Sequence, residues 1–276
     1  MTQVKNRHEI TFKKTVYESP GMDAIKLRPD VPYGESGPAP LSMDLYFPMG
    51  AQVGGRLPVV IFVAGFPDPG FEAFAGCKLK ETAGYTSWGK LAAASGIVGI
   101  TYTNREPVAD LDRLAAFVQN HAESLGIDEH RMALWACSGN VPTALGLLMQ
   151  ERSIAFKAAV LSYGVMLDPD GSIGIETAAA QLGFANPCAR RSEADLPKDL
   201  PLMIVRAGQD VVPGVNASID RFVAAALGRN LPVTVVNHPT APHSFDLLDD
   251  TEASREVIRQ ILAFLRFHLR APLDLR

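Results

Sequence analysis

The sequence contains few cysteines, only a small excess of acidic over basic residues and no pattern that marks a metal centre. Its three cysteines, Cys77, Cys137 and Cys188, are odd in number and far apart. This spacing argues against a disulfide framework and against a zinc cluster with paired ligands. A net charge of −4, with Lys and Arg scattered along the chain, provides no field to attract nucleic acid or an anionic membrane surface. These absences favour small-molecule chemistry.

Long hydrophobic runs are also absent. The apolar stretch 57–66 is far shorter than the roughly 18 residues that a membrane helix needs. The N-terminal residues 1–14 lack the apolar core and the small-residue cleavage site of a secretory signal. No His-Glu-x-x-His motif, phosphate-binding loop or dinucleotide fingerprint follows a predicted strand. We therefore expect a soluble, cytoplasmic protein that uses no cofactor or metal and has no nucleic-acid or membrane partner.

The composition, 47% hydrophobic and 20% charged, suits a single α/β domain over residues 1–276. Stretch 58–64, PVVIFVA, is β-branched and apolar on both faces, as in a central strand covered by helices on each side. Strand-like and helix-like stretches then alternate, which is typical of parallel strands joined by crossover helices. Further strands are expected over 97–102, 131–136, 158–163, 202–207 and 233–237, and helices over 86–95, 108–125, 141–150, 217–228 and 254–269. The pattern predicts a mostly parallel central sheet of about eight strands with helices on both faces.

Two regions depart from this alternation. The first fifty residues alternate apolar and polar side chains around 10–12 and 45–47, which predicts two early strands that could pair antiparallel. A stretch rich in Pro and Gly, 29–40, is expected to break the chain between them. Segment 164–200 is too long for an ordinary connection. We expect it to form a small cap inserted over the strand ends.

The candidate nucleophile is Ser138, at the point where the predicted strand 131–136 runs directly into the predicted helix 141–150. An abrupt strand-to-helix turn lifts one hydroxyl clear of the sheet edge, next to the positive end of the helix. Such a turn needs small neighbours, and the usual pattern is Gly-x-Ser-x-Gly. The flanking residues here are Ala136, which is nearly as small as Gly, and Asn140, which tolerates unusual backbone angles.

A second nucleophile is conceivable, because a thiolate is intrinsically more reactive than a hydroxyl and Cys137 is adjacent. With Cys137 as the nucleophile, the bulky Trp135 would lie two positions before it, where the turn needs a small residue. The flanking residues therefore favour Ser138. A structural interpretation also remains open. In it, Ser138 caps the following helix and Cys137 only fills the core.

A serine nucleophile needs a histidine base that a carboxylate orients. Asp210 comes just past a predicted strand, and His243 lies in the loop before the final helix, so the order is Ser, Asp, His. Asp210 could instead cap a turn, and Asp168 is a reserve acid. His238 abuts a strand end, and we expect it to be a structural hydrogen-bonding residue.

An oxyanion formed at an attacked carbonyl needs two hydrogen-bond donors. We expect these to be the backbone N–H of Gly139, which follows the nucleophile, and that of Phe66, in the Ala-Gly-Phe-Pro turn after the central strand. Phe66, Trp88, Cys137 and the cap are candidates for the lining of the substrate pocket.

The Ala-Gly-Phe turn, the Ala-Cys-Ser-Gly-Asn elbow, and Asp210 and His243 in that order resemble the α/β-hydrolase fold. The likeness extends over nearly the whole chain from about Leu41, and is to the small esterase and dienelactone-hydrolase-like branch. Ala64, Ala136 and Asn140 depart from the Gly that family members often carry.

The resemblance and the order of these residues lead us to expect a serine hydrolase that cleaves small carboxylic esters or lactones through an acyl-enzyme. The alternatives are a Cys137-dependent hydrolase of the dienelactone type and a non-catalytic member of the fold that binds a small ligand or a protein. The apolar face of the last helix could pack on the sheet or on a second subunit, so a homodimer is also compatible with the sequence.

Overall fold

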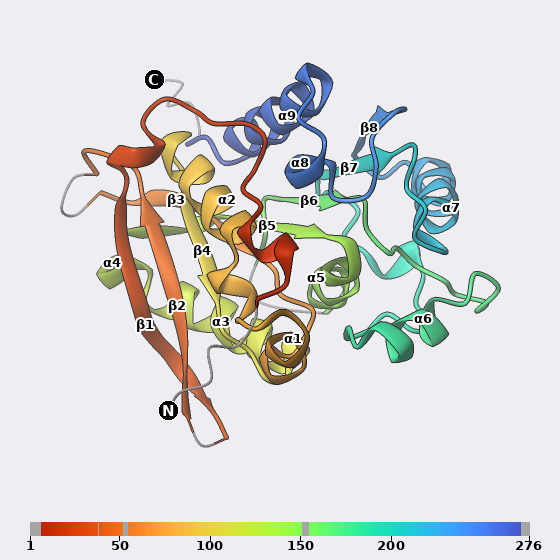
Figure 1. Ribbon diagram of the computed structural model, residues 1–276, viewed down its shortest axis with the longest axis horizontal. Helices are drawn as coiled ribbons and strands as arrows, with labels where there is room; N and C mark the ends of the chain where they lie inside the picture. The colour runs from red at the N-terminus through yellow and green to blue at the C-terminus, as the bar shows by residue number, and fades with distance from the viewer. Residues whose placement is uncertain (1–6, 38, 52–54, 151–154, 272–276) are drawn as a thin grey trace.

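A computed structural model describes residues 7–37, 39–51, 55–150 and 155–271 (Figure 1). Within them, eight strands form one sheet in the order β1-β2-β4-β3-β5-β6-β7-β8. Strand β2 is antiparallel to β1 and β4, and all other neighbouring strands are parallel. The strands are β1 (Lys26–Ser36), β2 (Ala39–Phe47), β3 (Leu57–Phe62), β4 (Val98–Tyr102), β5 (Ile127–Cys137), β6 (Ala158–Ser162), β7 (Leu202–Ala207) and β8 (Val233–His238). The predicted mostly parallel sheet is confirmed.

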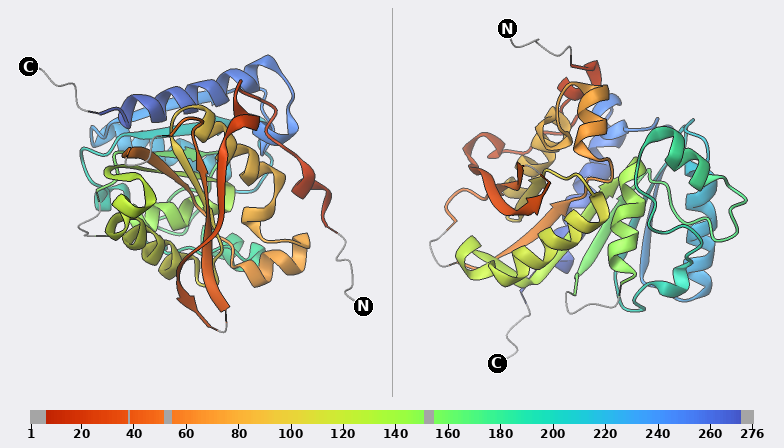
Figure 2. Two further views of the ribbon diagram at one scale, coloured as in Figure 1. Left: turned by 90° about the vertical axis from the view of Figure 1, so that its left-hand side faces the viewer. Right: turned by 90° about the horizontal axis from the view of Figure 1, so that it is seen from below.

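Helices cover both faces of the sheet, as predicted. Helices α2 and α9 lie on one face, and α3, α5 and α7 lie on the other (Figures 1 and 2). The helices are α1 (Asp68–Ala75), α2 (Ala83–Ala94), α3 (Pro107–Asn120), α4 (Ala122–Leu125), α5 (Val141–Leu148), α6 (Ile175–Leu182), α7 (Val215–Gly228), α8 (Phe245–Leu248) and α9 (Glu252–His268). The predicted helix 108–125 is divided at His121, where the backbone leaves the helical region.

The last helix illustrates why these segments are helical. The Thr251 side chain accepts a hydrogen bond from the Ser254 backbone N–H and so caps the first turn of α9. Apolar residues at helical spacing, among them Val257, Ile261 and Leu265, are buried against the sheet. No helix in the described ranges is long and apolar enough to cross a membrane.

The N-terminal region differs from the prediction. Residues 10–12 lie in a 3-10 turn (Glu9–Phe12) and not in a strand, and the first strand, β1, runs through the proposed break. Pro29 and Pro32 are tolerated because β1 is an edge strand, which in the described part of the chain pairs with β2 alone. The pairing also shifts register around both prolines, as in β-bulges. The antiparallel pair is therefore real, but its first strand is not the predicted one.

The parallel strands bring several loops to one edge of the sheet. The carboxyl ends of β3, β5, β7 and β8 meet there, because neighbouring parallel strands end on the same side. Segment 164–200, which we predict to be a cap and call the cap segment, contains α6 and a 3-10 turn (Glu193–Asp195). It reaches this edge through the Ala185 backbone N–H, which donates to the Gly65 carbonyl at 2.8 Å.

Candidate active site

A sharp turn follows β5 at Ser138. Cys137 is still extended, with φ −134° and ψ 154°, whereas Ser138 has φ +54°, in the left-handed region. A residue other than glycine held there costs about 1–3 kcal/mol, and such strain persists only where the surrounding structure imposes it. Helix α5 begins directly afterwards, with Pro142 in its first turn. The turn therefore has the strand-elbow-helix form that the sequence predicts.

Ser138, His243 and Asp210 form one chain of hydrogen bonds. The Ser138 Oγ lies 2.8 Å from the His243 Nε2, and the His243 Nδ1 lies 2.6 Å from the Asp210 Oδ2. The Asp210 side chain is fully buried, and its Oδ1 accepts the Val212 backbone N–H at 2.9 Å. The Nδ1–H of His243 donates a hydrogen bond to Asp210, so the lone pair is on the Nε2 and faces the Ser138 hydroxyl. The arrangement can remove a proton from Ser138.

The turn after β3 is fastened to the elbow by Asn140. The Gly65 backbone N–H donates to the Asn140 Oδ1 at 2.7 Å, and the Asn140 Nδ2 donates to the Cys137 carbonyl at 3.0 Å. A Cβ on Gly65 would lie 2.8 Å from both the Asn140 Cα and the Gly139 oxygen, so this approach requires glycine. We call these contacts the Asn140 clamp.

The two residues predicted to supply the oxyanion donors lie next to each other beside the clamp. A Cβ on Gly139 would lie 2.9 Å from the Phe66 Cζ, so the two residues are neighbours. The Phe66 N–H has no acceptor among the described residues, and the Gly139 N–H lies in the first turn of a helical segment, where amides have no partner within the helix. Asn140 has ordinary φ and ψ of −83° and −16°. Its predicted role, to tolerate unusual backbone angles in this turn, is therefore not needed.

Cys137 faces the interior. Its side chain is buried, and its Sγ lies 3.7 Å from the Asn140 Nδ2. Burial raises the pKa of the Cys137 thiol to about 12. A thiol that remains protonated near neutral pH is a poor nucleophile, so the geometry favours Ser138.

The prediction that Trp88 lines a substrate pocket is wrong. Only 2% of Trp88 is exposed, and its ring packs against Trp135 with centroids 4.8 Å apart. Its Nε1 donates to the Asp246 Oδ2 at 2.7 Å. Trp88 belongs to helix α2, which packs on one face of the sheet, and the sequence alone does not say which way its ring points.

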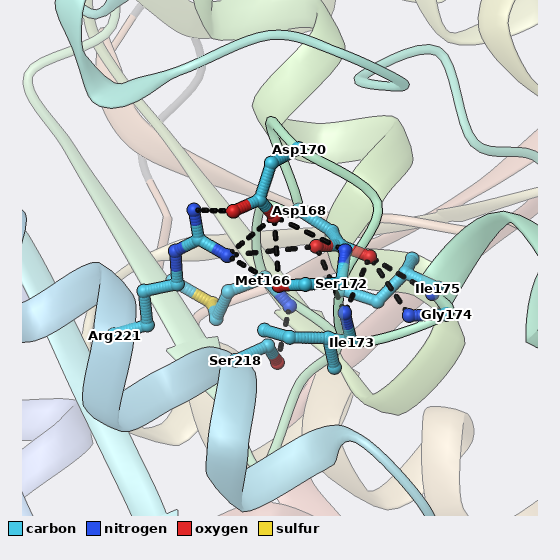
Figure 3. A network of polar contacts seen from close by, with 9 residues as sticks. All are labelled: Met166, Asp168, Asp170, Ser172, Ile173, Gly174, Ile175, Ser218 and Arg221. Atoms are coloured by element: carbon cyan, nitrogen blue, oxygen red, sulfur yellow. Dashed lines mark hydrogen bonds and ion pairs between the residues drawn. The ribbon is translucent and has the colours of Figure 1, made fainter.

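The reserve acid, Asp168, has another function in the fold. Its Oδ2 accepts the Gly174 backbone N–H at 2.9 Å, and the N–H groups of Ile173 and Ile175 lie 3.2 Å away (Figure 3). Arg221 of α7 pairs with Asp170 at 2.7 Å and lies 3.7 Å from Asp168. Asp168 therefore holds the first turn of α6 and, with Arg221, ties the cap segment to α7.

His238 agrees with its predicted structural role. It is buried, and its Nε2 lies 3.1 Å from the Ser254 Oγ and 3.6 Å from the Asp249 Oδ2. These contacts join the end of β8 to the start of α9.

Two phenylalanine rings, those of Phe66 and Phe184, lie beside the elbow, and the sequence indicates only Phe66. The Phe184 ring, 5% exposed, lies edge-on to the Phe66 ring with centroids 5.9 Å apart. The Phe184 Cδ1 would lie 2.9 Å from a Cβ on Gly139. Phe184 belongs to the cap segment and to no recognisable motif, so only the folded arrangement reveals it.

Cavities of about 510 to 680 Å³ elsewhere in the described part of the chain have other linings. One of about 510 Å³ lies between the N-terminal segment and α2, and one of about 680 Å³ lies between the end of α5 and residues 195–201. Neither is lined by a residue of the Ser138 chain. In the described ranges, no three His, Cys, Asp or Glu side chains gather as a metal site.

No protein-family model matches the sequence, and no curated protein sequence matches it. Solved structures do match. An esterase from Thermogutta terrifontis is 19% identical with a TM-score of 0.67, over 92% of this chain and 96% of that chain. A thermostable carboxylesterase cloned from a metagenomic library is 19% identical with a TM-score of 0.68, over 93% and 92%.

The same Thermogutta terrifontis esterase has been solved phosphonylated by sarin. That structure is 18% identical with a TM-score of 0.65, over 92% of this chain and 98% of that chain. At these identities the likeness shows the fold: the chain has the α/β-hydrolase fold that its elbow and its Ser, Asp, His order predict.

Proposed function

We propose that this chain is a serine hydrolase that cleaves carboxylic esters, or lactones, of small molecules through Ser138, His243 and Asp210. One observation carries the proposal. The three side chains follow three different strands, yet they form a continuous chain of hydrogen bonds with spacings of 2.8 and 2.6 Å. No cofactor is needed for this reaction.

In the first half of the reaction, the His243 Nε2 takes the proton of the Ser138 hydroxyl while the Oγ attacks the ester carbonyl carbon. The negative charge that develops on the carbonyl oxygen is held by the N–H groups of Phe66 and Gly139. Asp210 stabilises the imidazolium that forms. Collapse of the intermediate breaks the ester bond, and the leaving alcohol receives the proton from His243. The acyl group is then bound to Ser138.

Water completes the reaction. His243 takes a proton from a water molecule, whose oxygen attacks the acyl carbon and releases the acid when the bond to Ser138 breaks. The Ser138 oxygen regains its proton from His243, so the protein returns to its starting state. Residues 164–200 would cover the acyl group as a cap within a single domain, with Phe66 and Phe184 beside it.

The comparisons support the reaction class. The solved neighbours are described as esterases, and one of them reacts with sarin, an organophosphorus compound. A thiol hydrolase of the dienelactone type is disfavoured because Cys137 is buried and its pKa is raised to about 12. A purely binding protein would have no use for the strained φ of Ser138 or for the hydrogen bonds to it.

The test is hydrolysis of p-nitrophenyl esters together with labelling by a fluorophosphonate probe. We expect the wild-type protein to hydrolyse short-chain esters and to be labelled at Ser138. Ser138→Ala should abolish labelling and lower kcat by about 10⁴-fold or more. Cys137→Ala, which removes the neighbouring thiol, should keep both properties. Absence of labelling and hydrolysis in the wild-type protein would rule out the proposal and favour the binding alternative.

A further inference from the structure

A buried carboxylate lies three residues after His243. Asp246, in the short helix α8, is almost completely inaccessible. Its Oδ1 accepts the Tyr163 hydroxyl at 2.6 Å, and its Oδ2 accepts the Trp88 Nε1 at 2.7 Å. A buried carboxylate is costly unless hydrogen bonds compensate it, and here both oxygens have a donor. The catalytic steps proposed above do not use this group.

The Tyr163 ring connects this carboxylate to the imidazole. The ring centroids of Tyr163 and His243 are 5.1 Å apart, with an interplanar angle of 71°. The Phe245 ring also packs edge-on to Tyr163 at 5.6 Å. Tyr163 therefore lies against the imidazole at one end and is held by Asp246 at its hydroxyl end.

The backbone of Tyr163 is strained in a way that fixes this placement. Its φ is +35°, in a region that side-chain-bearing residues rarely adopt. Its N–H donates to the Val205 carbonyl at 2.7 Å, which ties it to the neighbouring strand β7. Strain of this kind persists where surrounding contacts impose it, and it gathers at functional sites.

The neighbours of Asp246 act on its pKa in opposite directions. Burial raises the pKa of Asp246, whereas the hydrogen bonds from Tyr163 and Trp88 and the charge of His243 lower it. The two remaining titratable neighbours, Cys137 and Tyr85, are both buried, and burial raises the pKa of each.

We propose that Asp246 and Tyr163 are positioning residues for His243. Asp210 holds the Nδ1 of the imidazole, and the Tyr163 ring restrains the same imidazole by packing against it. Asp246 anchors the Tyr163 hydroxyl and so keeps the ring in place. The inference rests on the proposed function, because it assumes that His243 is the base.

The test compares Asp246→Asn, Tyr163→Phe and the double variant in hydrolysis of p-nitrophenyl acetate. The concentration of active sites is measured by fluorophosphonate labelling, so that kcat refers to folded, labelled protein. We expect each single change to lower kcat by about 10- to 100-fold with KM almost unchanged, because a small misplacement of a catalytic base costs rate. The double variant should lose no more than the more damaged single variant, since the two residues act as a unit.

Asp249→Asn is the matched control. Asp249 lies three residues further on, and its Oδ2 accepts the hydroxyls of Ser254 at 2.6 Å and Thr251 at 2.9 Å. Loss of the Asp249 carboxylate should lower the melting temperature and leave kcat per labelled site unchanged. A purely structural role of Asp246 or Tyr163 would give this same result.

Wild-type kcat per labelled site in Asp246→Asn or in Tyr163→Phe would overturn the positioning proposal while leaving the proposed function intact. If Asp246→Asn does not fold, Tyr163→Phe decides alone, because it keeps the ring and removes only the hydroxyl. A wild-type rate no higher than that of Ser138→Ala would overturn the proposed function, and the positioning proposal with it.

Discussion

The Asn140 clamp yields a prediction that separates stability from catalysis. Asn140→Ala removes the acceptor of the Gly65 N–H and the donor to the Cys137 carbonyl, both of which are buried in the wild-type protein. A buried backbone group left without a partner costs about 1–3 kcal/mol, so the two losses should lower the free energy of unfolding by about 2–6 kcal/mol.

The same substitution should affect the reaction. Gly65 immediately precedes Phe66, so release of the Gly65 N–H lets the Phe66 donor shift away from the Gly139 donor. Complete removal of one oxyanion donor costs about 10²- to 10³-fold in kcat. A displaced donor should cost less, and we expect a fall in kcat of about 10- to 100-fold with little change in KM.

Thr103→Val is the matched control. Like Asn140, Thr103 accepts one backbone hydrogen bond and donates another, but both involve Ser42: it accepts the Ser42 N–H at 2.9 Å and donates to the Ser42 carbonyl at 3.2 Å. It follows β4, which β3 separates from β5 in the sheet. Urea unfolding and p-nitrophenyl acetate hydrolysis are measured on both variants. If Asn140→Ala, like Thr103→Val, lost stability but kept the wild-type kcat, the clamp would not be what positions the oxyanion donors.

Four further predictions address separate residues. Asp210→Asn should lower kcat by about 10⁴-fold, because the wrong tautomer of His243 would face the nucleophile; a loss below tenfold would contradict this in the ester assay. Cys137 should remain unmodified by iodoacetamide at pH 8 in mass spectrometry, because a pKa of about 12 leaves roughly one thiol in 10⁴ ionised; rapid alkylation of the folded protein would contradict its burial. Phe184→Ala should raise the ratio of kcat/KM for p-nitrophenyl hexanoate over acetate by about tenfold or more, since it removes the ring beside Gly139. An unchanged ratio would mean that Phe184 does not limit the length of the acyl chain. Burial raises the pKa of Asp68 from 3.8 to about 6. Between these values the unfolded state binds fewer protons, so stability should fall as pH rises from about 4 to 6, by about 3 kcal/mol for a shift of about two units. Asp68→Asn should remove this slope in urea unfolding, and parallel curves for the two proteins would refute it.

Much of the fold follows from local patterns in the sequence. The β-branched run in β3 and the alternation after it depend on short-range chemistry that the folded state preserves. The prediction for residues 10–12 failed because three alternating residues do not distinguish a strand from a short turn. The prolines of β1 predict a break because proline is excluded from central strands, and the sequence does not show that this strand lies at an edge.

The meeting of Ser138, Asp210 and His243 in one candidate site was predictable, because the proposed chemistry requires these residue types in a given order. It was not predictable where the direction of a side chain decides its role. The ring of Trp88 turns into the core, and Phe184 reaches the elbow only after the cap segment folds over it. The side chain of Asn140 is likewise used in a way that a comparison of turn residues cannot reveal, because its partner Gly65 lies 75 residues earlier.

The prolines of the edge strand have a consequence for the behaviour of the molecule at high concentration. An exposed edge offers unpaired N–H and C=O groups on which a strand of another molecule can add, and this is a route to aggregation. Pro29 and Pro32 have no N–H to offer, and the bulges beside them disturb the regular spacing that an added strand would need. Pro29 and Pro32, which make β1 hard to recognise in the sequence, thus hinder the addition of a further strand at the β1 edge of the sheet.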